Sequence, residues 1–422
     1  MSESATSVVS GASAAEDEQL AFGGPVGALA MMTLLPALTL YLWVCVHRHG
    51  GALVLPSSAL LAELPRPSPK ALGWLLGWVG SQLVLDLVLP GRDYLGLVQR
   101  DGVRRSYRLN GMASLLVTLV MLAGALGFGV LHGAAAVELL GSLLSTCILG
   151  CYLFSVWLYS FARPTRRGAG GIVYGYFMGT ALNPRVGRVD LKMFMESKIA
   201  MSGWLVLTIL MAHAEYERTG TASIPMMLVV GFQALYTLDF FWFEEAMLST
   251  WDINNENYGF MLAFAFLVWM PFCFSLQSQY LVYAEPELPV AAIVGLLALN
   301  LAGYYIFRSS NLQKHHFKTR PSGKIWGREP EFIQTARGTK LLASGWWSLA
   351  RHSNYLGDLM MALAWCLACG LTHIVPFFYF LYFTPLLIDR ERRDDQHCAR
   401  KYGADWERYR ERVPYRIVPF VY

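Results

Sequence analysis

Long runs of apolar residues, separated by polar segments, dominate the chain from residue 25 onward. An α-helix needs about 20 mainly apolar residues to cross the hydrocarbon of a bilayer. Ten segments approach or reach that length, and we expect membrane helices at 25–46, 71–89, 110–132, 138–162, 192–213, 222–247, 258–277, 289–307, 355–371 and 373–388. The last two are short and close together, which predicts a tight helical hairpin. The pattern therefore predicts an all-α, polytopic integral membrane protein.

The polar segments between these spans differ strongly in charge. Ten spans place both termini and every second loop on one side of the membrane. That side carries 28 Lys and Arg residues outside the spans, whereas the opposite side carries only Arg48, Arg66, Lys70 and Arg218. Cytosolic loops are enriched in Lys and Arg. We therefore expect both termini to be cytosolic, in the cytoplasmic membrane of a bacterium or the endoplasmic reticulum of a eukaryote.

Composition agrees with a membrane protein and defines one domain. Of the 422 residues, 55% are hydrophobic and 15% are charged, against roughly 25% charged in soluble domains. The first 24 residues contain four acidic residues and no Lys or Arg, which excludes a cleavable signal peptide with its basic start. We expect 1–24 to be a disordered acidic tail and 25–422 to be a single membrane domain.

A polar and aromatic cluster directly precedes the ninth predicted span. Residues 345–358 read GWWSLARHSNYLGD, and polar groups at the mouth of a membrane helix are costly unless a partner satisfies them. The basic segment 308–354 overlaps this cluster, and the basic segment 389–422 follows it. Arg and Lys bind phosphates, and Trp347 or Tyr355 can pack on a flat ring. The cluster predicts a phosphate-rich ligand with a ring; a belt binding anionic lipid headgroups is the alternative.

Other ligand signatures are weak. His315 and His316 are adjacent and point different ways on a helix, and the Cys366–Cys369 pair has no second pair beside it. The glycine-rich segments follow no predicted strand. We therefore predict neither a metal site nor a Rossmann nucleotide site.

Ionisable residues also occur within the predicted spans. In the sixth span Tyr236 and Asp239 are three residues apart and share a helix face, and Glu244 and Glu245 follow near its end. Carboxyl groups inside a membrane are costly and usually face a functional cavity, so one interpretation is a proton donor in an apolar pocket. The alternative is polar bridging between helices, for example by Lys198 with Glu196 or Glu245.

Several long motifs, in order along the chain, are similar to those of one family. They begin near residue 107 and continue to the C-terminus: 107–111 (YRLNG), 175–185 (GYFMGTALNPR), 304–308 (YYIFR), 345–358 and 413–417 (VPYRI). Together they resemble the sterol reductases that act on Δ14, Δ7 or Δ24(28) bonds, a family that includes the C-terminal half of lamin B receptor. The resemblance is particularly close to the bacterial Δ14-sterol reductase type.

The resemblance implies NADPH as cofactor, bound by the last part of the domain, about 289–422. Position 318 is often Arg in this family and is Lys here, which keeps the charge but lacks the forked guanidinium. Glu244 replaces the usual Asn, which bears on substrate preference. The residues implied for the cofactor site are Lys314, Lys318, Leu342, Trp347, Asn354, Tyr355, Arg390, Asp394, Cys398, Tyr402 and Tyr409.

The family's reaction requires an acid. An isolated sterol olefin does not accept hydride until one carbon is protonated, and protonation of C15 leaves a tertiary cation at C14. The site therefore needs a proton donor and a dry cavity. We expect Tyr236 to donate the proton, with Asp239 or Glu245 supplying or relaying it. The sterol would arrive from the bilayer and NADPH from the cytosol, with no nucleic acid and no obligate protein partner.

The shared motifs leave other functions open. Reduction of a Δ7 bond is the nearest alternative to Δ14. Membrane methyltransferases that use S-adenosylmethionine have a similar Arg-His-x-x-Tyr segment but lack the motifs at 182–185 and 304–308. A non-catalytic scaffold of the lamin B receptor kind would need a larger basic N-terminal domain. We therefore expect an NADPH-dependent Δ14-sterol reductase.

Overall fold

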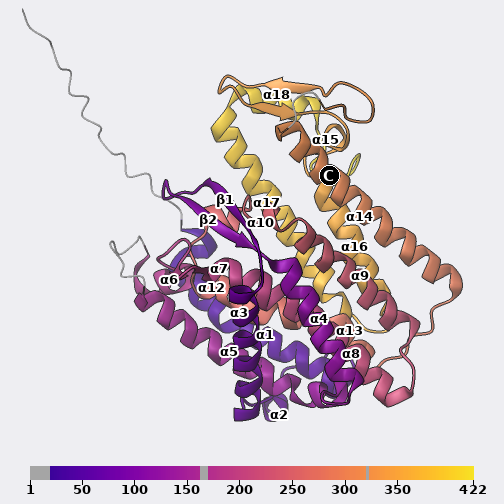
Figure 1. The fold of residues 1–422 in the computed structure, drawn as a ribbon. Coiled ribbons are helices and arrows are strands. Elements are labelled where there is room, and N and C mark those ends of the chain that lie inside the picture. The colour runs from indigo at the N-terminus through magenta and orange to yellow at the C-terminus, as the bar shows by residue number, and fades with distance from the viewer. Residues whose placement is uncertain (1–19, 162–169, 320–322) are drawn as a thin grey trace, which may run out of the picture.

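Long helices form most of the molecule, which is seen here in a computed structural model that describes residues 20–161, 170–319 and 323–422 (Figure 1). Residues 1–19 of the predicted acidic tail lie outside the described part of the chain. Within the described part, seven helical segments are long and apolar enough to cross a membrane: Ala21–His49, Pro69–Val88, Gly133–Ser160, Leu191–Thr219, Ile224–Trp242, Phe260–Leu281 and Val290–Thr319. The predicted all-α, polytopic membrane fold is confirmed.

The remaining three predicted spans are also helices, but each is shorter or more polar. Helix α4 (Gly111–Gly127) is apolar with 17 residues, and α16 (Ser353–Leu367) has 15. Helix α17 (Phe378–Tyr402) is apolar in its first half and strongly charged in its second. Helices α16 and α17 form the expected hairpin through η4 (Val375–Phe377).

The other elements divide into long helices and short connecting pieces. The long ones are α1 (Gly24–His49), α3 (Pro69–Val88), α5 (Gly133–Phe161), α8 (Ser202–Thr219), α9 (Ile224–Trp242) and α14 (Val290–Thr319). The short ones are η1 (Ala21–Gly23), α2 (Ser58–Glu63), α6 (Gly171–Met178), α7 (Leu191–Phe194), α10 (Glu244–Met247), α11 (Trp251–Asn255), α12 (Phe260–Phe264), α13 (Leu276–Leu281), α15 (Trp346–Leu349) and α18 (Ala404–Arg412). Six strands pair antiparallel in order: β1 (Arg92–Val98) with β2 (Arg104–Leu109), β3 (Arg185–Val186) with β4 (Val189–Asp190), and β5 (Phe332–Gln334) with β6 (Lys340–Leu342).

Local sequence sets where the membrane helices begin and end. Helices α3 and α9 both start with a capping serine followed by proline in the first turn, and Ser68 and Ser223 accept the N–H of Ala71 and Met226. Such a serine satisfies an amide that the helix leaves unpaired, and proline lacks the amide at that position. At the other end of α8, Gly220 adopts φ +80°, which favours glycine.

Two π-helical segments interrupt the core of the bundle. They are η2 (Met195–Met201), which continues into α8, and η3 (Ala265–Cys273), which follows α12 and contains Pro271. The two segments pack against each other. The wider π turn is uncommon and frequently marks functional sites.

Helices α14 and α16 approach each other closely at two glycines. A Cβ on Gly303 would lie 2.7 Å from the Gly357 carbonyl oxygen, and a Cβ on Gly357 would lie 2.5 Å from that of Gly303. Only glycine permits this backbone approach. The crossing brings the 304–308 motif of α14 beside the 354–358 segment of α16.

The connecting segments gather at two ends of the bundle. At one end the Arg100 amide donates to the Asn254 carbonyl at 3.1 Å, and Arg390 pairs with Asp252 at 3.3 Å, which joins β1–β2 to α11 and α17. Figure 1 shows β1, β2, α15 and α18 toward this end and α2 at the other. The opposite end is linked by other pairs, namely His49 with Glu63 and Arg218 with Glu285.

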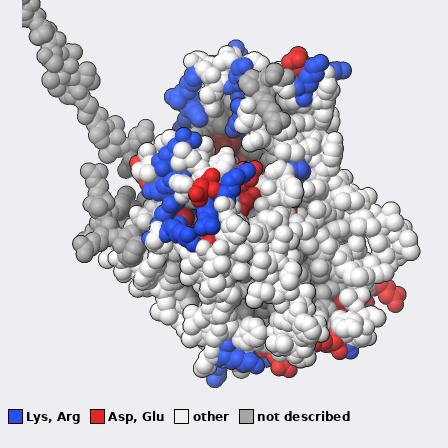
Figure 2. All heavy atoms as spheres, viewed as in Figure 1, with Lys and Arg blue, Asp and Glu red and all other residues white. Residues whose placement is uncertain are grey.

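Two features differ from the sequence-based expectation. Helix α14 continues to Thr319, so Lys314 and Lys318 lie on a helix rather than in a loop that starts at residue 308. The β1–β2 hairpin was not predicted. Figure 2 shows Lys and Arg gathered over this hairpin and at the same end of the molecule, above a broad uncharged surface.

Candidate functional site

Tyr236 lies within a cage of aromatic rings inside the bundle. Its ring centroid is 5.5 Å from Trp365 of α16, 5.9 Å from Trp204 of α8 and 6.2 Å from Phe307 of α14. The Tyr236 hydroxyl also interacts with the carboxyl group of Asp358 on α16. Four helices therefore position this phenol, and its one polar group faces a second acid.

Asp239 follows one turn later on α9 and is held from α14. The Nε of Arg308 donates to Asp239 Oδ1 at 2.8 Å, and a second guanidinium nitrogen donates to Oδ2. The Tyr304 hydroxyl donates to Oδ1 at 2.9 Å. Arg308 also lies over the ring of Phe243, 3.7 Å from its centroid. This forked, charge-assisted pair fixes the carboxylate beside Tyr236.

Glu245 does not continue the face that carries Tyr236 and Asp239. Helix α9 ends at Trp242, and Phe243 has φ −110° and ψ 37°, outside the helical region. The chain turns there, and Glu245 points to Arg92 of β1 with a closest distance of 3.7 Å. The structure thus brings two of the three predicted catalytic residues together and places the third with a different partner.

Lys198 is bridged as the alternative interpretation expected, but to other acids. Its Nζ lies 4.0 Å from Glu244 and 3.9 Å from Asp86, and it donates to Asn110 Oδ1 at 2.6 Å. Neither Glu196 nor Glu245, the partners named from sequence, is among these contacts. Glu244 also accepts the Gly111 amide at 2.9 Å, so it joins α10 to the start of α4.

Part of the predicted cofactor site assembles around Trp347. Trp347 is 3% exposed and packs with Leu342 and Ile325. Its indole N–H donates to the Ser310 carbonyl of α14 at 2.9 Å. The Lys314 ammonium lies 4.1 Å from the centroid of the Trp347 ring. Lys318, one turn further along α14, is exposed.

A second part assembles where α17 meets α18. Cys398 and Tyr402 pack on a cluster that contains Ala343, Trp406 and Tyr409. Ala343 directly follows Leu342, so this part is continuous with the surroundings of Trp347. Burial raises the pKa of the Tyr409 hydroxyl, which is therefore protonated and able to donate.

The third part assembles around His352. Tyr355 stacks on His352 with ring centroids 4.7 Å apart, and His352 Nε2 lies 3.5 Å from Asp394. Burial, together with the nearby Lys314 and Arg351, lowers the pKa of His352 to about 3, so the imidazole is neutral at pH 7. Arg390 reaches Asp252 but is half exposed.

Asn354 carries an unsatisfied polar atom in this region. Its Oδ1 is buried and has no hydrogen-bond partner among the residues that the structure describes. Such an atom is uncommon in folded proteins and calls for a donor. Asn354 precedes Asp358 by one helical turn on α16, so the two residues share a helix face.

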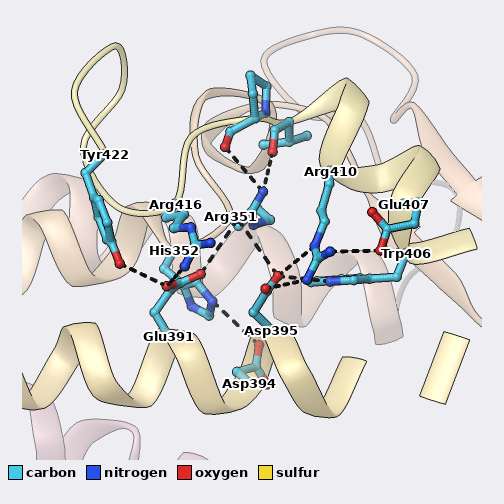
Figure 3. A network of polar contacts seen from close by, with 12 residues as sticks. Arg351, His352, Glu391, Asp394, Asp395, Trp406, Glu407, Arg410, Arg416 and Tyr422 are labelled. Atoms are coloured by element: carbon cyan, nitrogen blue, oxygen red, sulfur yellow. Dashed lines mark hydrogen bonds and ion pairs between the residues drawn. The ribbon is translucent and has the colours of Figure 1, made fainter. Parts of the chain in front are cut away.

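An ion-pair network fixes the polar end of α17 to the start of α16 (Figure 3). Arg351, which is 5% exposed, lies 3.7 Å from Glu391 and 3.9 Å from Asp395. Its guanidinium also donates to the Val413 carbonyl. Arg410 and Trp406 bind Asp395, and Arg416 binds Glu391 at 3.0 Å. The network holds the C-terminal segment against the predicted cofactor residues.

Sequence reasoning missed several partners in the site. Arg308 and Tyr304 lie in a motif that was recognised, but their contact with Asp239 crosses 69 and 65 positions. Asp358 was noted as polar without a role. Trp204 and Trp365 carried no signal beyond their apolar surroundings.

Comparison with known proteins identifies the family. The model of the ergosterol biosynthesis ERG4/ERG24 family matches residues 16 to 422. The chain belongs to this family. A protein named Delta(14)-sterol reductase from Methylotuvimicrobium alcaliphilum is 45% identical over 402 residues, covering 93% of this chain and 94% of that protein.

Two animal members extend the comparison. Delta(14)-sterol reductase TM7SF2 of Mus musculus is 42% identical, covering 97% of this chain and 99% of that protein. Delta(14)-sterol reductase LBR of Gallus gallus is 39% identical over 94% of this chain but only 63% of its own length. The similarity thus extends over nearly the whole chain, including the helices that frame both clusters.

Proposed function

We propose that this protein is an NADPH-dependent Δ14-sterol reductase, which saturates the C14=C15 bond of a sterol dissolved in the membrane. The observation that carries the proposal is the connection between two clusters. Tyr236, in its aromatic cage, interacts with Asp358, and Asp358 lies one turn after Asn354 in the predicted cofactor region. A proton donor and a cofactor site on adjoining helices are what reduction of an isolated double bond requires.

The residues of the cofactor region suit NADPH in chemistry. Lys314, Lys318 and Arg390 are exposed cations that could contact phosphates. The buried Oδ1 of Asn354 lacks a donor, which the amino group of a carboxamide would supply. Tyr355 and Tyr402 offer partly exposed rings and hydroxyls, and Leu342, Trp347, Asp394, Cys398 and Tyr409 complete the set. When bound, NADPH supplies hydride to the sterol cation.

Tyr236 is the proposed proton donor. The π electrons of the olefin form a C–H bond at C15 with the phenol proton, and the O–H bond breaks. This step leaves a phenolate on Tyr236 and a cation at C14. Asp358, whose carboxyl group interacts with the hydroxyl, would return a proton to the phenolate. Two acids were predicted to supply or relay the proton. Asp239 lies one turn from Tyr236 on α9, whereas Glu245 lies beyond the end of α9 and pairs with Arg92.

The surroundings of Tyr236 suit a short-lived cation. Asp239, held by Arg308 and Tyr304, keeps negative charge one turn away. The rings of Trp204 and Trp365 pack against Tyr236 in T-shaped geometry, and the π face of an aromatic ring attracts a nearby cation. Stabilising groups that are already oriented act most strongly in a dry site.

The proposal is tested with purified protein, NADPH and a Δ8,14-sterol. Tyr236→Phe should lower turnover by about 10² to 10⁴-fold, the range for loss of a general acid, without loss of the folded state. Tyr216→Phe, which removes a hydroxyl from an exposed tyrosine at the end of α8, is the matched control. Full turnover in Tyr236→Phe would refute the assignment, and loss of turnover in Glu245→Gln would restore Glu245 as the relay.

Two finer points belong to the same proposal. Parallel incubation with Δ8,14-, Δ7- and Δ24(28)-sterols, followed by product analysis, tests the choice of double bond. We also infer that both termini and the cofactor end face the cytosol, because the exposed basic residues gather there (Figure 2). The orientation would be tested by introducing cysteines in β1–β2 or in α2 and treating intact cells with a thiol reagent that does not cross the membrane. Cysteines in α2 should be modified, and those in β1–β2 should not.

A further inference from the structure

An apolar cavity lies on the opposite side of α8 from Tyr236. Its volume is about 300 Å³, at the lower end of known ligand sites. Helices α3, α4, α5 and α8 and both π-helical segments line it, with Ile199 from η2 and Leu267 and Phe272 from η3. Trp74 and Met121 also line the cavity and are 48% and 59% exposed, so it opens to the outside of the bundle.

Helix α8 forms the wall between this cavity and the proposed reaction site. Gly203, Val206 and Leu207 face the cavity. Trp204, the next residue after Gly203, packs against Tyr236 in a T-shaped arrangement with ring centroids 5.9 Å apart. The two sites are therefore separate, and they share one helix as a wall.

One buried polar atom in this cavity lacks a partner. Gln82 is 1% exposed, and its Nε2 donates to Thr118 Oγ1 at 3.0 Å. The Thr118 hydroxyl donates to the Ser114 carbonyl at 2.7 Å, so it must accept from Gln82, and this fixes the orientation of the amide. Gln82 Oε1 then has no donor among the described residues.

The other polar groups of the cavity narrow the ligand. The Ser81 hydroxyl already donates to the Trp78 carbonyl at 2.8 Å. No Lys, Arg, Asp or Glu is among the described residues that line the cavity. A phospholipid headgroup would find no counter-charge, and a carboxylate would meet the Gln82 oxygen, which repels it. The occupant that fits is a bulky apolar molecule with one neutral hydroxyl.

We propose that this cavity is a second sterol-binding site, in which Gln82 Oε1 accepts the hydrogen bond of the sterol 3-hydroxyl. The sterol skeleton would lie against the walls of α3, α4 and α8 and enter between Trp74 and Met121 from the bilayer. The description of this site as second rests on the proposed function, which places the reaction beside Tyr236.

The test is photolabelling of the full-length protein in lipid nanodiscs with a 3β-hydroxysterol that carries a diazirine on its ring system. Peptide mapping should locate adducts both on α3 or α4 and on α9 or α16. Gln82→Leu should lower α3 and α4 labelling by about tenfold or more, since the buried hydroxyl loses its acceptor. It should leave α9 and α16 labelling and turnover unchanged.

Three comparisons make the outcome decisive. Ser81→Ala, whose hydroxyl is already satisfied, should label as the unmodified protein does. Gly203→Leu, which projects into the cavity, should abolish α3 and α4 labelling, and its melting temperature reports whether it is folded. A 3-deoxy analogue should label α3 and α4 weakly and equally in the unmodified protein and in Gln82→Leu.

Either of two results would overturn the inference: unchanged α3 and α4 labelling in Gln82→Leu, or equal labelling by the hydroxysterol and its 3-deoxy analogue in the unmodified protein. Both would indicate an acyl chain site without hydroxyl recognition. Tyr236→Phe separates this inference from the proposed function, because that variant should lose turnover while α3 and α4 labelling persists.

Discussion

Two carboxylates near the end of α9 each pair with a cation inside the bundle, half-buried Arg308 or buried Lys198, and the surroundings of the two pairs differ. Asp239 binds Arg308 and lies one turn from Tyr236 among aromatic rings. Glu244 lies near Lys198 and binds the first amide of α4. Both carboxylates are less than a tenth exposed.

The two ion pairs differ in the groups that surround them. Glu244 of α10 has partners in α4 and in η2, namely the Gly111 amide and Lys198, so the cluster ties three elements together. Around Asp239 the neighbouring hydroxyl of Tyr236 meets a second acid and a cage of rings. A buried ion pair alone is weak evidence of function or of stability, and the groups beside it indicate which role applies.

Matched amide substitutions would separate the two roles, and the larger effect is expected at Asp239. Asp239→Asn keeps the shape and the bond from Tyr304 but removes the negative charge near the sterol cation. We expect turnover to fall by about 10² to 10³-fold, the scale for losing one preorganised electrostatic group. Turnover of a Δ8,14-sterol with purified protein is the measurement, and a loss below about threefold would contradict a catalytic role for this charge.

Glu244→Gln should mainly change stability. The amide oxygen can still accept the Gly111 N–H, but Lys198 loses a neighbouring charge inside the bundle. We expect a loss of about 1–3 kcal/mol in the free energy of unfolding, read as a lower melting temperature in detergent, while turnover per folded molecule stays within about threefold. If Glu244→Gln instead changed which sterol is reduced, the Glu that this chain has in place of the family's usual Asn would govern substrate preference.

The spans of the fold were predictable from sequence, because the bilayer imposes a minimum length of apolar helix. Their ends were less predictable. The 289–307 apolar run stops where charges begin, yet α14 continues to Thr319 as a surface helix. Glu245 was expected beside Tyr236 because the apolar pattern continues past Trp242, whereas Phe243 leaves the helical region and turns the chain.

The residues of the site were recognisable, but their partners were not. Spacing along one helix gave Tyr236 and Asp239 a common face. The contact of Asp239 with Arg308 depends on how α9 and α14 cross, and that crossing depends on the close approach at Gly303 and Gly357. Family resemblance names residues that recur; it does not state which atoms meet.

A smaller effect is expected at the edge of the cofactor region, where the cations are exposed. Lys314→Ala removes a charge that lies over the Trp347 ring without burying any group. We expect KM for NADPH to rise about tenfold, equivalent to about 1.4 kcal/mol, with kcat little changed. Lys340→Ala, which removes another ring-contacting lysine at the β5–β6 hairpin, is the matched control. Equal changes in both variants would attribute the effect to general surface charge.

His352 differs from both carboxylates because the fold keeps it neutral. Its pKa is about 3 in the folded protein against an ordinary value of 6.5. Below pH 6.5 the unfolded chain therefore binds a proton that the folded protein does not, so stability is full above that pH and falls as the pH decreases toward 3. Between pH 7 and 5.5 this group should account for a loss of about 1 kcal/mol.

The same histidine stacks on Tyr355 and faces Asp394. Its substitution therefore helps to distinguish residues that position the cofactor from residues that take part in the reaction. His352→Gln cannot be protonated in this range, and its melting temperature should therefore depend less on pH than that of the unmodified protein. Parallel melting curves against pH for the two proteins would contradict the assignment. Because His352 contacts candidate cofactor residues but not Tyr236, the variant should affect KM for NADPH more than kcat, whereas Asp239→Asn should do the reverse.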